Sequence, residues 1–553
     1  MPRAVELLQQ GRNEELWQMC CGFLSLSLDQ FMSIQRRLLS EQIELLKRCP
    51  LGYKIMRGAR PETVEEFRRQ VPLTSYDNYC PELLEKKENL LPVKPAYWVR
   101  TSGKSGEYNC KWVPISPSYS SELSRIMYGV GILSSCRGWG DVSQINDFPK
   151  IVYAVAPRPY TSGTLAAMLE EQTPTGYLPS LEEAERLDFA DRIKAGFKQA
   201  LSQGIDFFFG ISLVLVTIGN QFSQPTGKVN ILPLLSQPKA LFRLIRGIIK
   251  SKLARRPLLP KDIWSLKGIM SGGLDSGVYR DKIKELWGRY PLDVYVGTEG
   301  GIIATQTWDY DSMTFIPNLN FLEFIPEKER FKWQLNHRYQ PKTVLLDEVK
   351  AGEDYEIVIT NFYGGALVRY RPGDMVRITS LRNEKLGINI PQMAFVGRAD
   401  DLIDFAVTRL TEKTIWQAIE NTRIPYEDWV ARKDVEDKML LHLYIELKDG
   451  HRISGAKIGV AVEEQLKRLD NSLITTQSHD VGGSLDFGLK VTLLPRGAFA
   501  NYTAKRHAEG ADLAHLKPPH INPSEKVLSL LVTRPEAMPE IRVAATREKV
   551  AVH

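Results

Sequence analysis

Apolar residues recur at three- and four-residue intervals through residues 2–48, as in the run from Ile34 to Leu46. This spacing is typical of helices that bury one face. Two prolines interrupt the chain further on, and a short helix is expected between them at residues 64–69. Residues 1–75 are therefore predicted to form a helical lead-in.

From about residue 150 the pattern changes to short apolar runs separated by amphipathic segments. Ile151–Val155, Ser212–Val216 and Leu292–Val296 are predicted as strands, and residues 181–203 as a helix. Strands that alternate with helices are typical of a largely parallel, doubly wound sheet. Such sheets bind ligands at the carboxyl ends of their strands, so candidate chemistry is expected there.

The pattern changes again near residue 398, where small and charged residues indicate a hinge. Beyond it, Thr411 is placed to cap a helix over residues 412–421, and strand-like and helical segments alternate. The expected domains are a large N-terminal domain at 1–397, the hinge at 398–402 and a small α+β domain at 403–553 with a frayed tail from about 535.

Composition excludes some classes of protein. Apolar content of 43% and charged content of 25% are ordinary for a soluble globular chain, and a net charge of +6 gives no case for nucleic acid. Six cysteines without C-x-x-C spacing favour a reducing cytoplasm over a disulfide framework or a zinc site. The longest apolar run, Phe207–Gly219, is too short to span a bilayer, so we expect no transmembrane segment.

A loop rich in glycine and hydroxyl residues occupies residues 99–107. Small residues let backbone amides converge on an anion, which makes this loop a candidate phosphate cradle. Its Gly103–Ser105 string (Gly-Lys-Ser) is not a P-loop, because Trp98 stands where that motif needs a glycine. An ordinary surface turn is the other interpretation.

Polar residues follow several predicted strands. Thr298 and Glu299 offer a hydroxyl and a carboxylate, which suit a phosphate and its Mg²⁺. Asp374 lies on a tight turn where it could accept hydrogen bonds from ribose hydroxyls. Lys517 lies in a proline-stiffened loop from which it could reach a phosphate. Each has an ordinary alternative: a solvated carboxylate, a turn cap or a surface lysine.

Residues 238–256 form a basic amphipathic segment with Leu244, Ile245 and Ile249 on its apolar face. Such a helix either packs its apolar stripe on the domain or lies on an anionic membrane surface. Packing on the domain is the interpretation we prefer.

The order of these signals resembles that of the adenylate-forming superfamily, and within it the auxin-responsive acyl-acid amido synthetases. The resemblance covers about residues 30 to 525. It is carried by four passages: Val71–Asp77, Leu322–Pro326, Tyr355–Thr360 running into Arg369–Asp374, and Pro495–Phe499 running through Gly510 to Pro518.

The resemblance implies an α/β fold: a large N-terminal domain with mixed and parallel sheets, plus a small mobile α+β C-terminal domain. It implies an ATP-dependent ligase that turns a carboxylic acid into an acyl adenylate, releases pyrophosphate and passes the acyl group to an amine, usually an amino acid. Two alternatives stay open: an acid–thiol ligase that makes an acyl-CoA, and a nucleotide-binding protein that has lost turnover. The last is suggested by Lys104, because the family usually has a hydroxyl residue there.

The resemblance also implies roles for individual residues, with ATP and Mg²⁺ as the groups bound. Thr101, Ser102 and Gly103 would hold the β- and γ-phosphates, with Lys104 and Ser105 in the same loop. Thr298 would contact the α-phosphate, and Glu299 would bind Mg²⁺. Gly273 and Tyr295 would border the adenine, and Asp374 would bind the ribose, while Arg398 would reach the nucleotide near the hinge and Lys517 would assist adenylation.

Overall fold

The computed structural model describes residues 2–101, 110–210, 212–223, 237–271, 276–336, 338–398, 402–404, 409–435, 439–469, 488–508 and 517–533. The chain divides into two compact units, Met1–Ala399 and Asp400–His553. Each unit is described by itself. The hinge at residues 398–402 stays a prediction.

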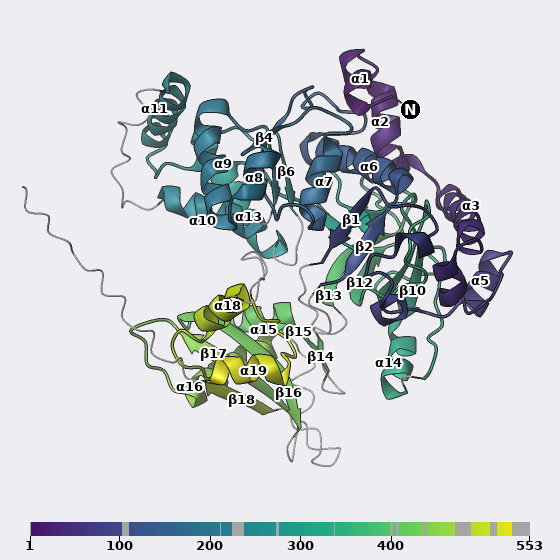
Figure 1. Cartoon of the computed structure of the whole chain (residues 1–553). Helices are drawn as coiled ribbons and strands as arrows, with labels where there is room; N and C mark the ends of the chain where they lie inside the picture. The colour runs from purple at the N-terminus through teal and green to yellow at the C-terminus, as the bar shows by residue number, and fades with distance from the viewer. Residues whose placement is uncertain are drawn as a thin grey trace, which may run out of the picture. The chain divides into compact units, whose positions relative to one another are not determined.

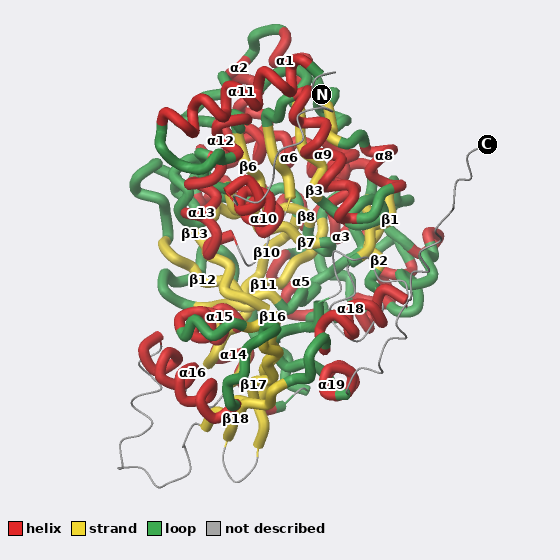
Figure 2. The backbone as a smooth tube through the Cα atoms, turned by 90° about the vertical axis from the view of Figure 1, so that its left-hand side faces the viewer, coloured by secondary structure: helices red, strands yellow, loops and turns green. Residues whose placement is uncertain are grey.

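Eleven strands of the first unit form one sheet that is half parallel and half antiparallel (Figure 1, Figure 2). The strand order is β10-β11-β12-β13-β9-β8-β7-β6-β5-β3-β4, with parallel pairing from β7 to β4 and antiparallel pairing from β10 to β7. The doubly wound prediction is right for the parallel half only, and the mixed α/β fold class is confirmed. The parallel strands are β3 (Lys150–Ala154), β4 (Gly176–Leu178), β5 (Phe207–Gly210), β6 (Gly268–Ser271) and β7 (Leu292–Gly297). The antiparallel strands are β8 (Gly301–Thr305), β9 (Met313–Phe315), β10 (Asn320–Pro326), β11 (Asp354–Asn361), β12 (Asp374–Ser380) and β13 (Gln392–Arg398).

The N-terminal lead-in is helical, as the apolar spacing predicts. Its longest helix begins after Ser27, whose side chain accepts a hydrogen bond from Gln30 N. This helix contacts the sheet, because the buried Gln35 amide donates to the carbonyls of Pro317 and Asn320 at 2.5 and 2.7 Å. The lead-in helices are α1 (Ala4–Gln9), α2 (Asn13–Cys21), α3 (Leu28–Leu46), α4 (Pro50–Ile55) and α5 (Val64–Gln70).

The strand prediction at Ser212–Val216 is wrong. These residues begin helix α10, and the strand is the preceding apolar run, β5. Leu215 and Val216 are buried because α10 packs into the second hydrophobic core, beside Leu286 of α13. A short apolar run has the same pattern in a buried helix as in a buried strand, so periodicity does not separate the two. The helices of this half are α6 (Pro117–Ser135), α7 (Thr161–Leu169), α8 (Leu181–Arg186), α9 (Phe189–Gln203), α10 (Ser212–Ser223), α11 (Pro238–Leu253), α12 (Pro260–Ile263) and α13 (Ser276–Trp287), with α14 (Glu327–Leu335) beside the antiparallel half.

The predicted single helix at residues 181–203 is two helices, α8 and α9. The first ends at Arg186, and Asp188 caps the start of the second, since its carboxylate accepts a hydrogen bond from Asp191 N at 2.8 Å. An aspartate at this position satisfies an amide that lacks a partner within the helix.

A buried arginine joins three of the passages that carry the resemblance. The Arg369 guanidinium makes a two-pronged ion pair with Glu323 at 2.8 and 2.9 Å, and it donates to the carbonyls of Arg68 and Val71 at 2.6 Å each. Arg369 is 5% exposed and Glu323 1%. Planar guanidinium and carboxylate groups match in this geometry, and here both charged groups are buried inside the unit. We call this set of contacts the Arg369 interlock.

The apolar run at residues 366–371, which follows β11, makes single bridges and forms no full strand. Tyr370 bridges Ile359 of β11 on one side and Thr74 of the lead-in on the other. Arg369 has a φ of +45°, which an extended strand does not allow. The chain therefore turns at Arg369 to place its side chain in the interlock.

The second unit is a small α+β assembly whose sheet has the order β16-β17-β18. The predicted cap is confirmed: the Thr411 side chain accepts a hydrogen bond from Thr414 N at the start of α15. No described helix of the chain is long and apolar enough to cross a bilayer. The elements are β14 (Leu402–Asp404), β15 (Arg409–Thr411), α15 (Glu412–Asn421), β16 (Tyr426–Val435), β17 (Met439–Leu447), α16 (Gly455–Leu469), β18 (Gly488–Leu493), α18 (Ala498–Ala508) and α19 (Glu525–Val532).

Candidate active site

Loops from several elements meet at the carboxyl end of the parallel strands. Thr161, which begins α7 after β3, has its hydroxyl 2.7 Å from the hydroxyl of Thr298, which follows β7. The hairpin of β1 (Tyr97–Arg100) and β2 (Trp112–Ile115) reaches the same edge, because Arg100 N donates to Pro159 O at 3.0 Å. The place predicted for ligand binding therefore gathers polar side chains from three separate stretches of chain.

Thr101 stands at the base of the glycine loop. Its amide donates to Lys111 O, and its hydroxyl accepts from Lys111 N, both at 2.9 Å. These two hydrogen bonds continue the hairpin and fix where the loop leaves it. The other proposed members of the phosphate cradle, Ser102, Gly103, Lys104 and Ser105, lie outside the described residues, as does Gly273.

Two buried asparagine side chains donate hydrogen bonds to the backbone of the turn that carries Glu299. Asn361 of β11 donates to Glu299 O at 2.9 Å, and Asn320 of β10 donates to Gly300 O at 2.6 Å. The two asparagine side chains also bond each other at 2.8 Å. Gly301 closes the turn with a φ of +61°, a conformation that favours glycine. The backbone around Glu299 is thus fixed while its carboxylate is half-buried.

The Glu299 carboxylate faces a tyrosine, which in turn contacts a lysine. Tyr370 Oη lies 3.4 Å from Glu299 Oε1, and Lys111 Nζ lies 3.4 Å from Tyr370 Oη. Tyr370 is 1% exposed, so its ring is fixed by the packing around it. Among the described residues no cluster of three metal-ligating side chains exists. One carboxylate nevertheless fits Mg²⁺, which in nucleotide sites takes one or two carboxylates and completes its shell with phosphate oxygens and water.

Tyr295 and Asp374 meet although their strands are far apart in the sheet order. The Tyr295 hydroxyl donates to Asp374 Oδ2 at 2.7 Å, and the Tyr295 ring packs on Phe395 with 5.3 Å between centroids. Strands β7 and β12 are four steps apart, which in a flat sheet is about 19 Å. The sheet therefore curls, and this curl brings the proposed adenine and ribose contacts together. Arg398 pairs with Asp374 through the backbone of β13.

Lys517 lies in the second unit beside a chain of charged groups. Its Nζ is 3.1 Å from Asp428, and the same carboxylate contacts His520 Nε2 at 3.0 Å. His520 Nδ1 is 2.6 Å from Glu412. Lys517 also lines a cavity of about 450 Å³, together with Asp428 and Glu446. Asp428 is buried, which raises its pKa, but His520 and Lys517 outweigh this effect and hold the pKa below its usual value.

The charge chain predicts a pH-dependent stability. Burial lowers the pKa of His520, but Asp428 and Glu412 raise it from 6.5 to about 9. A raised pKa means that the protonated ring stabilises the fold fully below about pH 6.5 and that this stability is lost as the pH rises to about 9. The loss is about 3 kcal/mol at most.

Urea unfolding of the full chain at a series of pH values from about 6.5 to about 9 measures this loss of stability. The local probe is the fluorescence of Trp429, which stacks on His520 at 4.7 Å. The variant His520→Gln keeps a polar side chain without the charge, and its stability should not fall over this range. An equal fall in wild type and variant would contradict the assignment.

Three residues of the site carry no strong sequence signal of their own. Tyr370 and Asn361 sit inside or beside strand-like runs, and Lys111 follows the glycine loop as one lysine among many. Their roles come from tertiary contacts. Tyr370 was within reach of sequence reasoning, because it belongs to the passage Arg369–Asp374.

Two family models match this chain. The model described as the GH3 family N-terminal domain matches residues 22–144, and the GH3 family central domain matches residues 313–398. Among curated proteins, the jasmonoyl–L-amino acid synthetase JAR4 of Nicotiana attenuata is 30% identical over 275 residues, which is 46% of this chain and 43% of that protein. The indole-3-acetic acid-amido synthetase GH3.15 of Arabidopsis thaliana is 28% identical over 233 residues, 40% of this chain and 38% of that protein. The chain thus spans less than half the length of these relatives.

Solved structures show the same fold. The AtGH3.15 acyl acid amido synthetase in complex with 2,4-DB matches with a TM-score of 0.60 and 16% identity, over 90% of this chain and 93% of that one. An open conformation of 2-hydroxyisobutyryl-CoA ligase matches with a TM-score of 0.52 and 15% identity, over 84% and 87%. At these identities the likeness shows the fold alone, which this chain shares with both enzymes. The two domain models match in order along the sequence, so this chain is similar to the GH3 family over residues 22–144 and 313–398.

Proposed function

We propose that this protein is an ATP-dependent ligase that activates a carboxylic acid as an acyl adenylate and transfers the acyl group to an amine. The observation that carries this proposal is the meeting of Thr298, Glu299 and Thr161 at the strand ends, with Tyr295 and Asp374 paired on the curled sheet. These groups suit the two ends of a nucleotide: hydroxyls and a carboxylate for the phosphates, an aromatic ring and a carboxylate for the nucleoside.

The residues divide the work of the first step. The substrate carboxylate attacks the α-phosphorus of ATP, the bond from that phosphorus to the bridging oxygen breaks, and pyrophosphate leaves with that oxygen. Mg²⁺, when bound, would neutralise charge on the phosphates. Glu299 would hold it, Thr298 would donate to the α-phosphate, and Thr101 would anchor the cradle loop. Positioning and charge stabilisation then supply most of the catalysis, since the protein moves no proton in this step.

For the second step we propose an amine acceptor, with an amino acid as the first candidate. The names of the curated relatives, an amino acid synthetase for jasmonate and an amido synthetase for indole-3-acetate, support this choice. The amine nitrogen attacks the acyl carbon, and AMP leaves. The structural likeness to a CoA ligase keeps an acid–thiol ligase as the alternative. We place the activity in the cytoplasm, which fits six free cysteines, four of them buried.

ATP–pyrophosphate exchange across a panel of carboxylic acids tests the first step. Exchange that depends on one or more acids is the expected result. Mass analysis with amino acids or coenzyme A added then distinguishes an amide from a thioester. If ATP binds but no acid supports exchange, the protein is a nucleotide-binding protein without turnover, and the proposal is wrong.

Lys517 is proposed to assist the adenylation step, and its substitution separates the two steps. We expect Lys517→Ala to slow adenylation by about a hundredfold, because a cation near the reacting phosphate stabilises developing negative charge. Hydrolysis of preformed acyl adenylate should be unchanged. Single-turnover kinetics with ATP and acid, and separately with adenylate, measure both. The control is Lys526→Ala on α19, and equal effects in the two variants would contradict the role.

A further inference from the structure

Helix α11 carries two apolar faces on opposite sides. Its inner face is buried and consists of Ala240, Leu244, Gly247 and Ser251. A Cβ at Gly247 would lie 3.1 Å from Ile263 of α12, so the helix packs closely there. The predicted packing of this helix on its domain is correct for this face.

The outer face of α11 exposes a stripe of large apolar side chains. Phe242 is 67% exposed, Ile245 47%, Ile249 53% and Leu253 80%. Spacings of three and four residues align all four along one side of the helix, over about 16 Å. Figure 1 and Figure 2 both show α11 on the outside of the helices around the parallel strands. Among the described residues, no other helix exposes so many large apolar side chains.

Basic residues flank the stripe, and acidic residues are absent from the helix sequence. Arg246 and Lys250 lie on one side of the exposed stripe, and Lys252 lies on the other. The segment from Pro238 to Lys261 contains five further basic residues and no aspartate or glutamate. Arg256 is one of them, and it is held by an ion pair with Asp262 at 2.7 Å. The exposed apolar stripe is thus surrounded by positive charge.

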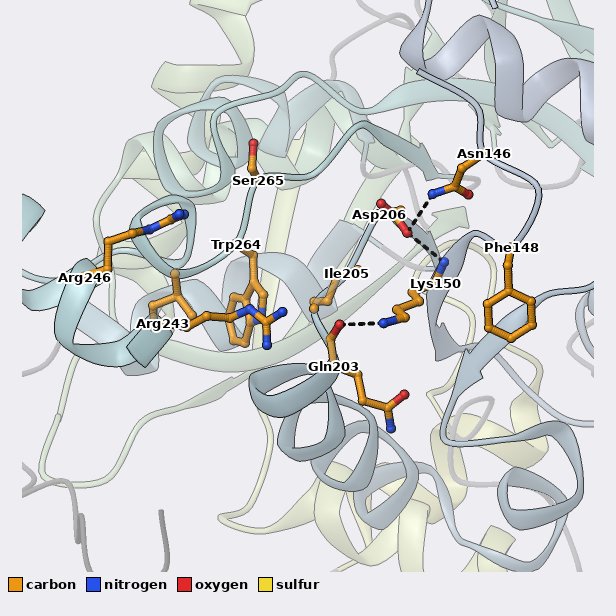
Figure 3. A pocket seen from close by; sticks show the side chains of 12 residues that line it. Asn146, Phe148, Lys150, Gln203, Ile205, Asp206, Arg243, Arg246, Trp264 and Ser265 are labelled. Carbon is orange, nitrogen blue, oxygen red and sulfur yellow. Dashed lines mark hydrogen bonds between the residues drawn. The ribbon is translucent and has the colours of Figure 1, made fainter. Parts of the chain in front are cut away.

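A polar pocket lies along the same flank (Figure 3). It encloses about 400 Å³, and its charged lining is Lys150, Arg243, Arg246 and Asp206. The only acidic side chain of that lining is already paired with Asn146 and Lys267, at 3.3 and 3.0 Å. Arg246 belongs to both the pocket and the flank of the stripe.

We propose that α11 docks this protein onto an anionic lipid bilayer, with the stripe in the headgroup–acyl boundary and the basic flank against headgroup phosphates. A helix with apolar residues on one side and Lys or Arg beside them binds membranes in the plane of the interface. Each basic residue near the surface adds attraction to an anionic leaflet. Charge complementarity favours this occupant over a second copy of the chain, because two copies of α11 would bring like charges together.

Vesicle flotation of the full chain tests the proposal. The probes are vesicles of phosphatidylcholine alone and of phosphatidylcholine with about 30% phosphatidylserine, since the anionic lipid sets the surface potential. We expect wild type to float with the anionic vesicles only, and about 0.5 M salt to weaken this binding. The variant pair Phe242→Asp with Ile249→Asp, and the pair Arg246→Glu with Lys250→Glu, should each lower binding by about tenfold or more.

The matched control is Val460→Asp on α16, another side chain that is 70% exposed, and it should bind like wild type. All these variants should keep the wild-type circular dichroism spectrum, because only exposed side chains change. Absence of wild-type flotation would overturn the proposal, and so would equal flotation of the stripe variants. Concentration-dependent dimerisation that the stripe variants abolish would show a second copy as the occupant and would also overturn it.

Discussion

Substituting Glu299 by glutamine is expected to lower ATP–pyrophosphate exchange by about a thousandfold, because the lost charge is the one that we propose holds the metal ion on the phosphates. The fold should be unaffected. Asn361 holds Glu299 through its backbone carbonyl, and the carboxylate makes only a long contact of 3.4 Å with Tyr370 among the described residues. Steady-state exchange with a supporting acid gives the size of the effect.

A separate measurement distinguishes metal binding from a structural role. Calorimetric titration with ATP in the absence of Mg²⁺ should give the same affinity for wild type and Glu299→Gln, whereas Mg²⁺ should strengthen binding only in wild type. Glu285→Gln on α13 is the control, since that exposed carboxylate pairs with Lys282 on its own helix. Exchange at the wild-type rate in the Glu299 variant would show that the metal assignment is wrong.

Truncating Arg369 is expected to cause the largest loss of stability in the chain. Arg369→Ala removes the two-pronged partner of the buried Glu323 carboxylate, which keeps the Thr343 hydroxyl and a longer contact with Arg68, and it removes the donors to two main-chain carbonyls. Breaking a buried ion pair in this way costs about 3 to 5 kcal/mol. Urea unfolding of the first unit measures the change, followed by tryptophan fluorescence.

The chain offers a control with the same pairing geometry on its surface. Arg377 makes a two-pronged contact with Asp354 at 2.7 and 2.8 Å, but its side chain is 54% exposed. Arg377→Ala should therefore cost less than about 1 kcal/mol. Similar losses in both variants would contradict the view that burial makes the interlock important.

Local sequence patterns predicted much of the fold because they act over short distances. The strands around Ile151 and Val296 and the cap at Thr411 follow from apolar runs and one hydrogen-bonding side chain, and all are confirmed. The failure at Ser212–Val216 has a physical reason: the start of α10 is buried, so its short apolar run has no polar position that would distinguish it from a strand. The antiparallel half of the sheet was not predicted in detail, since its pairing depends on contacts between distant segments.

The candidate site was predictable where chemistry and position coincide. Thr298 and Glu299 lie on the turn after β7, Asp374 begins β12, and the resemblance implied a role for each. Tyr370 and Asn361 were not found, because a tyrosine or an asparagine in a strand has many uses and only the curled sheet and the interlock direct these two toward Glu299. The roles proposed for all of the site residues, Lys517 and Arg398 included, stay predictions.

The Arg369 interlock also has a consequence for synthesis of the chain on the ribosome. Arg369 binds Arg68 O, and 301 positions separate the two residues. At about 5 to 20 residues per second, they are made roughly 15 to 60 seconds apart. During that interval the carbonyls of Arg68 and Val71 lack their arginine donor, and Tyr370, which contacts Glu299, has not yet been synthesised. The site can therefore close only late in translation, and until then the nascent lead-in is a natural client for chaperones.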